Sequence, residues 1–241
     1  MKILHLCAFA CIYALSFSPS AFAEETAMTL EDKLNQRKTE FSKQADEHTK
    51  EEFEKGVQMV TESGALEKAK QVGDTAPDFT LPNAAGEDIT LSHLLKSGPV
   101  VMIWYRGEWC PYCNIQLEDI QSHIDEFNEL GAQVVAISPE TPDNGWTMTD
   151  KLSLEFHVLS DVKSKIAEEY GVVYQLPENI SELLLQRFDL HGRNADERNL
   201  LPLAAAYVIE EDGTISYAYL DGDYRKRAET TDIIAHLKTN R

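Results

Sequence analysis

Two cysteines three residues apart form the part of this sequence best suited to do chemistry. Cys110 and Cys113 enclose Pro111, and they stand where an apolar run gives way to a helix-forming run. Proline favours the first helical position, so Cys110 is the expected N-cap and Cys113 falls in the first turn. Free N–H groups and the positive end of the helix dipole lower the pKa of a thiol from about 8.5. The spacing therefore predicts a redox-active pair that can also close a disulfide.

The cysteine pair is also compatible with structural roles and with metal binding. A structural disulfide suits an oxidising compartment, but closing so short a loop adds little stability in the chain-entropy model. A structural zinc site needs four ligands, whereas the histidines here are scattered and no second such pair is present. Redox catalysis is favoured over both. Copper binding by a soft thiolate pair is kept as a non-enzymatic alternative.

Charged and aromatic residues surround the pair in the sequence. A reactive thiolate needs a positive group beside it to hold it ionised, and Arg106 is the local candidate. Glu108 would raise the pKa of the thiols unless Arg106 neutralises it. Trp104 is expected in the core, whereas Trp109 and Tyr112 are expected at the rim of a substrate groove.

The elements that must position these residues follow from the apolar periodicity. Residues 99–105 are typical of a buried central strand, and a helix is expected at 111–130, ended by Gly131. Further strands are expected at 79–81, 89–91, 133–138, 157–159, 203–209 and 214–219, and further helices at 146–154, 163–170 and 228–237. This order predicts an α/β fold with a mixed central sheet flanked by helices. Residues 172–202 show no regular pattern and are treated as an insertion.

The first 23 residues have the composition of a secretory signal peptide. Lys2 precedes an apolar run that ends by Phe17, and Ala21 and Ala23 stand where a signal peptidase reads. The run is shorter than the roughly 20 residues that a membrane anchor needs. Cleavage after Ala23 is predicted, with delivery to the periplasm or the exterior and no membrane association afterwards.

The charge balance excludes some classes of partner. The whole chain has 22 basic and 41 acidic residues, a net charge of −19, and loss of Lys2 with the signal peptide gives 21 − 41 = −20. Such a chain is unsuited to nucleic acid or to anionic lipid. Residues 24–72 carry apolar residues at helical spacing in a charged background. They are expected to form a solvated helical extension with a structural or dimerising role, so a homodimer is among the expected assemblies.

The order of motifs resembles the peroxiredoxin-like branch of the alkyl hydroperoxide reductase/thiol-specific antioxidant family, within the thioredoxin-like superfamily. The matching segments are residues 73–79, 104–114, 131–139, 156–161, the Asp212-Gly213 turn and 223–229. The resemblance covers residues 60–240 and implies a thioredoxin-like domain at 73–241. It further implies thiol-based reduction of peroxides or disulfides. No cofactor or metal is expected, and the expected partners are a peroxide substrate and a thioredoxin-like protein as reductant.

The resemblance also suggests roles for individual residues. On the family signature Pro-x-x-x-Thr-x-x-Cys, Arg106 replaces the proline, Cys110 the threonine, and Cys113 is the peroxidatic cysteine. In a thioredoxin-type interpretation, Cys110 is instead the nucleophile and Cys113 the buried resolving thiol, and both assignments stay open. In the segment 201–206, relatives place a cis-proline (thioredoxins) or an arginine (peroxiredoxins) at the position where this chain has Ala204, and Pro202 stands two residues earlier.

Arg227 is the second candidate for the positive group, from its Asp-Tyr-x-x-Arg context. The alternative for this residue is an ion pair with Asp223 or Glu229.

The sequence is therefore compatible with three functions. The first is a thiol peroxidase in which Cys113 becomes a sulfenic acid, Cys110 condenses with it to a disulfide, and a thioredoxin-like partner reduces that disulfide. The second is a periplasmic thiol–disulfide oxidoreductase with Cys110 as nucleophile. The third is a copper-binding module without enzymatic activity.

Overall fold

The strand Val100–Trp104, β3, lies at the centre of a five-stranded mixed sheet, and each of its residues is buried. The computed structural model describes residues 28–240, so the predicted signal peptide and its cleavage site lie outside the described residues. The sheet order is β5-β4-β3-β8-β9, with β4 and β5 parallel to β3, and β8 and β9 antiparallel to their neighbours. β3 is flanked by β4 (Gln133–Ser138) and β8 (Ala204–Ile209), and the edge strands are β5 (His157–Ser160) and β9 (Ile215–Asp221).

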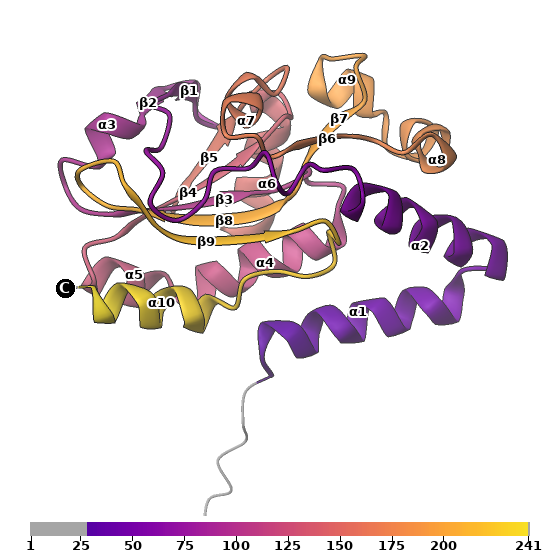
Figure 1. The fold of residues 1–241 in the computed structure, drawn as a ribbon, viewed down its shortest axis with the longest axis horizontal. Coiled ribbons are helices and arrows are strands. Elements are labelled where there is room, and N and C mark those ends of the chain that lie inside the picture. The colour runs from indigo at the N-terminus through magenta and orange to yellow at the C-terminus, as the bar shows by residue number, and fades with distance from the viewer. Residues whose placement is uncertain (1–27, 241) are drawn as a thin grey trace, which may run out of the picture.

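Helices cover both faces of this sheet (Figure 1). Successive side chains of β3 point to opposite faces, so Val101 and Ile103 join one buried cluster while Val100, Met102 and Trp104 join the other. The first cluster packs under α4 (Pro111–Ser122), α5 (Ile124–Glu129), α6 (Pro142–Leu152) and α10 (Thr230–Thr239). The second lies against α3 (Leu91–Leu94), α7 (Lys165–Glu169) and the hairpin β1 (Thr80–Pro82)–β2 (Asp88–Thr90). The predicted α/β architecture and the core position of Trp104 are confirmed.

Two sequence-based expectations about the elements are wrong. The helix expected at 111–130 is two helices, because the backbone at His123 leaves the helical region with φ −112° and ψ 12°. Residues 172–202 are not irregular. They form a two-stranded antiparallel sheet and two helices: β6 (Val173–Gln175), α8 (Glu178–Phe188), α9 (Leu190–Asn194) and β7 (Leu200–Pro202).

The helix boundaries differ by a few residues elsewhere, with α7 shorter at its start because Lys163 and Ser164 adopt positive φ angles. None of the helices between residues 28 and 240 is both long and apolar enough to cross a membrane.

Helices α1 (Leu30–Gln44) and α2 (Glu47–Thr61) are present as expected, and most of their residues are exposed, but the first turns of α1 pack against the domain. Leu30 and Leu34 are buried in the main core. Lys33 Nζ pairs with the Asp119 carboxylate of α4 at 2.5 Å. The Glu229 carboxylate accepts from the first N–H groups of α1. These contacts fix α1 beside α4, and hence beside the cysteine pair.

Candidate active site

The cysteines stand at the start of α4, where the sequence places them. Cys110 is the N-cap, with an extended backbone (φ −92°, ψ 108°), and Pro111 follows at the first helical position. The Cys113 N–H donates to the Cys110 carbonyl at 3.0 Å, which closes the first turn. Both side chains are buried, Cys110 at 1% exposure and Cys113 at 0%, and both are free thiols.

Nitrogen donors converge on the sulfur of Cys113. The Arg106 backbone N–H donates to it at 3.4 Å, and so does Arg227 Nη2 at 3.4 Å. The Arg227 side chain is held in place by the Gln116 side chain (3.2 Å) and the Tyr224 carbonyl (2.7 Å). A thiolate at this position would therefore be hydrogen-bonded and paired with a fixed cation.

These contacts separate the pKa values of the two thiols. Burial works to raise the pKa of Cys113, but a hydrogen bond from Cys110 and the charges of Arg227 and Arg106 outweigh it and lower the pKa to about 5. Burial, together with the neighbouring Cys113 sulfur, raises the pKa of Cys110 well above its ordinary value. The contacts therefore favour ionisation of the inner sulfur, that of Cys113, over ionisation of the outer sulfur, that of Cys110.

Arg106 stabilises the site in a different manner from Arg227. Its guanidinium lies over the rings of Tyr224, at 4.1 Å, and Trp109, at 4.7 Å. The side chain makes no hydrogen bond within residues 28–240, and its buried Nε has no partner. Arg106 thus brings an uncompensated positive charge to the reactive centre.

Glu108 is neutralised by cations other than Arg106, the residue considered for this role from the sequence. Its carboxylate pairs with Lys151 at 2.5 Å and with Arg193 at 3.4 Å. Sequence reasoning missed Glu140, which is fully buried and accepts from the Glu108 N–H at 2.7 Å and from Arg193 at 3.1 Å. Burial raises the pKa of Glu140. Its place just beyond β4, the parallel neighbour of β3, was the one signal that could have indicated it.

The loop that carries Arg106 depends on a glycine. Gly107 has φ +146°, and a Cβ there would lie 2.4 Å from Trp109 Nε1 and 2.8 Å from the Glu140 carboxyl carbon. Only glycine lets the loop pass so close to these groups.

Arg227 provides the guanidinium that the resemblance places before the strand of Ala204. Ala204 is the first residue of β8, where it pairs with Asp221 of β9, and its side chain is uncharged. The ion pairs considered for Arg227 are absent from the described part of the chain, because Asp223 pairs with Arg225 and Glu229 caps α1. A group close to the cysteines in sequence, the Arg106 backbone N–H, and a group more than one hundred residues away, the Arg227 guanidinium, therefore meet at the sulfur of Cys113.

A cavity of about 300 Å³ opens above Cys110. Trp109 and Tyr112 line it, which agrees with their expected place at a groove. The remaining walls come from the N-terminal helices, from α8 and from the loop before α10: Arg37, Phe41, Thr49, Phe53, Leu183, Leu184, Arg187, Phe188, Tyr224 and Arg225, with Arg106 and Pro111 beside Cys110. The segments at 24–72 and 172–202, to which the sequence assigned no chemistry, thus complete the site.

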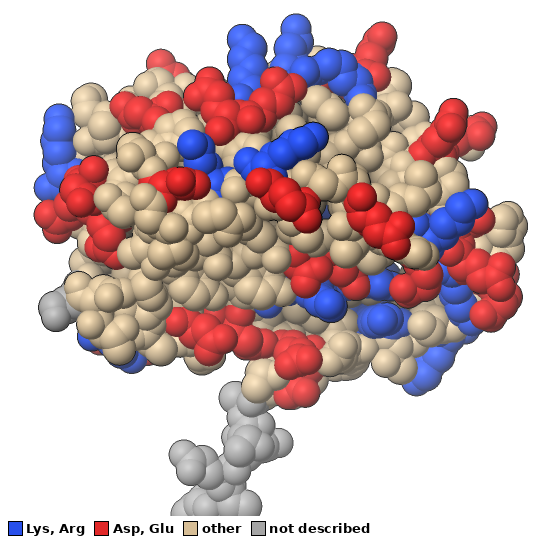
Figure 2. All heavy atoms as spheres, in the orientation of Figure 1, with Lys and Arg blue, Asp and Glu red and all other residues tan. Residues whose placement is uncertain are grey.

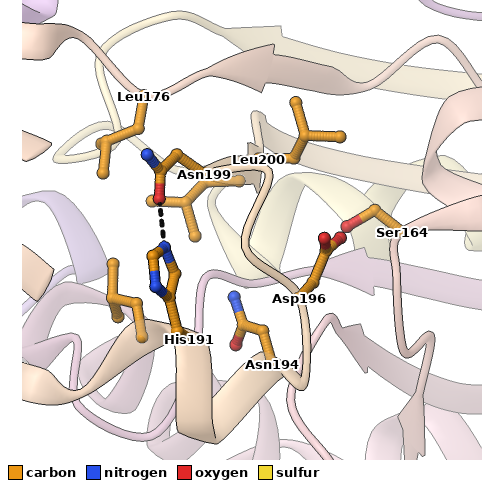
Figure 3. Close-up of a pocket in the computed structure, with 9 residues that line it drawn as sticks. Ser164, Leu176, His191, Asn194, Asp196, Asn199 and Leu200 are labelled. Carbon is orange, nitrogen blue, oxygen red and sulfur yellow. Dashed lines mark hydrogen bonds between the residues drawn. The ribbon is translucent and has the colours of Figure 1, made fainter.

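A second cavity lies apart from the cysteines, between α9 and β7 (Figure 3). Polar residues and leucines line it together, and His191 Nε2 lies 2.7 Å from the Asn199 side-chain oxygen. Its volume of about 10 Å³ accommodates roughly one water molecule. Among residues 28–240 no group of three or more His, Cys, Asp or Glu side chains is placed to hold a metal ion.

The chain is similar in sequence to known proteins over the part that contains the cysteine pair and the central sheet. The AhpC/TSA family model matches residues 72–218. A chloroplastic peroxiredoxin Q of Sedum lineare is 30% identical over 147 residues, covering 61% of this chain and 67% of the relative. Peroxiredoxin Bcp of Escherichia coli K12 is 30% identical over 102 residues, covering 42% of this chain and 65% of that protein. The match spans 58% of the peroxiredoxin Q of Gentiana triflora.

Solved structures share the fold. Peroxidoxin BcpB of Mycobacterium tuberculosis aligns with a TM-score of 0.57 at 24% identity, over 71% of this chain and 98% of that one. A peroxiredoxin 6 mutant of Arenicola marina aligns with a TM-score of 0.59 at 13% identity, over 71% of this chain and 74% of that one. The thioredoxin-like architecture is therefore common to these proteins and this chain.

Proposed function

Because the chain belongs to the AhpC/TSA family, we propose that it is a thiol-dependent peroxidase that reduces hydrogen peroxide or organic hydroperoxides. The observation that carries this proposal is the environment of the Cys113 sulfur. Two N–H donors at 3.4 Å and a pKa of about 5 make it a thiolate at neutral pH. The family relationship favours this function over the disulfide oxidoreductase and the copper-binding module.

In the first step the Cys113 thiolate attacks one oxygen of the peroxide. An S–O bond forms and the O–O bond breaks, so the sulfur is oxidised by two electrons to a sulfenic acid and the peroxide is reduced. The second oxygen leaves as an alkoxide or hydroxide and takes a proton. Arg227, hydrogen-bonded to the sulfur, and Arg106, whose charge also acts on Cys113, offset the negative charge that moves onto the leaving oxygen.

In the second step the Cys110 thiol attacks the sulfenic sulfur of Cys113. An S–S bond forms and water leaves, which requires no unwinding of α4 because both residues belong to its first turn. A dithiol partner of thioredoxin type then supplies two electrons and reduces the disulfide. Cys110 lines the cavity, so the partner's thiolate would attack that sulfur.

We also propose that the protein is exported to the periplasm. The composition of residues 1–23 supports cleavage after Ala23 and delivery to the periplasm. Amino-terminal sequencing of the protein recovered from fractionated cells tests it. The expected chain begins at Glu24 in the periplasmic fraction, and an intact amino terminus in the cytoplasm would contradict export.

Stopped-flow peroxide consumption by reduced protein tests the catalytic assignment. Cys113→Ser is expected to slow the reaction by at least about 10³-fold, because the nucleophile is removed. The matched variant Cys110→Ser should still consume about one equivalent of peroxide in the first turnover and then fail to form the intramolecular disulfide. Rapid consumption by Cys113→Ser would refute the role of Cys113.

A further inference from the structure

The cavity above Cys110 is larger and more apolar than hydrogen peroxide requires. Its volume is about 300 Å³, whereas a water-sized molecule needs roughly 10–15 Å³. Its walls contain three aromatic pairs with these centroid separations: Phe41–Phe53 at 5.4 Å, Trp109–Phe188 at 4.9 Å and Tyr112–Tyr224 at 5.6 Å. Walls of this kind bind hydrocarbon groups.

The charge of the same cavity is opposite to that of the chain. Four arginines and no Asp or Glu of the described residues line it, although the chain has 41 acidic and 22 basic residues. Figure 2 shows acidic and basic side chains interspersed on one face of the molecule, including the α1–α2 end. An anionic ligand is favoured in the cavity and disfavoured over most of the surface.

The four arginines differ in whether an acidic side chain already neutralises their charge. Arg225 is paired with Asp223 and Glu54. Arg37, half-buried on α1, has a single ion pair, a long 3.8 Å contact with an exposed neighbour on its own helix. Arg187, exposed near the end of α8, makes no ion pair within residues 28–240. Arg37 and Arg187 are therefore able to bind an additional anion.

The remaining arginine, Arg106, marks the buried end of the cavity. Arg106 is 2% exposed, and it lies at the inner end with Cys110, whereas Arg37 and Arg187 lie toward solvent. A ligand with a hydroperoxide near one end and a charge at the other would place the peroxide at Arg106 and the charge at the solvent side.

We propose that this pocket selects hydroperoxides carried on an apolar chain that ends in a carboxylate, with Arg37 and Arg187 binding the carboxylate. The inference rests on the proposed peroxidase function. It makes α1 and α8 the elements that determine which peroxide the site prefers.

Steady-state kinetics with a long-chain fatty-acid hydroperoxide and its methyl ester test this selection. Wild-type protein is expected to show a higher kcat/KM for the acid, and added salt should reduce that preference. The double variant Arg37→Gln/Arg187→Gln should lower the acid-to-ester ratio of kcat/KM by about five- to tenfold, the effect of two partly exposed ion pairs. The matched variant Lys43→Gln removes one charge from an exposed position of α1 outside the cavity and should leave the ratio unchanged.

A second variant examines the apolar wall. Phe41→Ala should lower kcat/KM for acid and ester alike, by about tenfold, and keep their ratio near the wild-type value. Equal turnover of acid and ester by wild-type protein, or the same loss of ratio in Lys43→Gln, would overturn the inference. Failure to reduce hydrogen peroxide and both hydroperoxides would instead overturn the proposed function, so the two failures are distinguishable.

Discussion

The inner and outer sides of the cysteine pair are one helical turn apart but differ in their physical character. On the inner side, Cys113 accepts from the Arg227 guanidinium, which is itself held by Gln116. On the outer side, Cys110 lies beside Arg106, whose guanidinium rests on aromatic rings without a hydrogen bond. The inner side is built to ionise a sulfur, whereas the outer side is built to admit an apolar substrate and to supply the second thiol.

The largest expected effect sharpens the contrast between the two arginines. Arg227→Met removes both a charge and a direct hydrogen bond to Cys113, so the rate of sulfenic acid formation should fall by about 10²-fold or more. Arg106→Met keeps the backbone N–H bond to the sulfur and should cost about tenfold. Thiolate absorbance against pH should show a larger rise in the Cys113 pKa for Arg227→Met. The reverse order would contradict the division into inner and outer sides.

The pH dependence of the reaction follows from the inner side. Because the folded pKa of Cys113 is about 5, the rate constant should be nearly constant at neutral pH and fall as pH drops through 5. The folded pKa is lower than the unfolded value of 9.0, so ionisation stabilises the folded state fully above pH 9, and this stabilisation is lost as pH falls toward 5. Unfolding of reduced wild type and Cys113→Ser across this range measures the difference. A rate that titrates near pH 9 would show an ordinary thiol.

A smaller effect is expected from a substitution at Glu140, which holds the loop that carries Arg106. Glu140→Gln replaces an acceptor of the Glu108 N–H and the Arg193 guanidinium by an amide, and should lower the free energy of unfolding by about 1–3 kcal/mol. The peroxidase rate should fall less than in Arg106→Met, since no reacting atom is touched. Chemical denaturation and stopped-flow kinetics on the same sample check both statements, and an unchanged stability would show that the buried contacts are not needed.

The smallest effect concerns the attachment of α1, which forms part of the outer wall. Lys33→Met breaks the pair with Asp119 but leaves the Thr230 hydroxyl bonded to that carboxylate. The loss should be about 1 kcal/mol or less, because the lysine is partly exposed. Hydrogen exchange should become faster in α1 and stay unchanged in β3. Equal acceleration in both elements would mean that α1 does not open independently.

The chemistry of the pair could be predicted from the sequence because it is local. Proline at the first helical position and a three-residue spacing fix Cys110 and Cys113 on one turn whatever surrounds them. The buried strand Val100–Trp104 could be predicted equally well, since a short continuous apolar run is typical of a central strand. Arg227 became a candidate only through its resemblance to a family motif.

The outer wall could not be predicted, because its residues have no common sequence signal. Arg37 and Phe188 are ordinary helical residues until tertiary packing brings α1 and α8 to the same cavity. Glu140 belongs to the same class, since its importance comes from burial rather than from any local pattern. The division of the helix at His123 was missed because no proline or glycine marks it.

The central claim is that Cys113 is the sulfur that meets the peroxide first. A substoichiometric peroxide pulse, quenched with a label selective for sulfenic acid and mapped by peptide mass spectrometry, tests it directly. The account predicts the label on Cys113, and in Cys110→Ser the label should persist there because no second thiol can condense. Label on Cys110 in wild-type protein, with none on Cys113, would contradict the account.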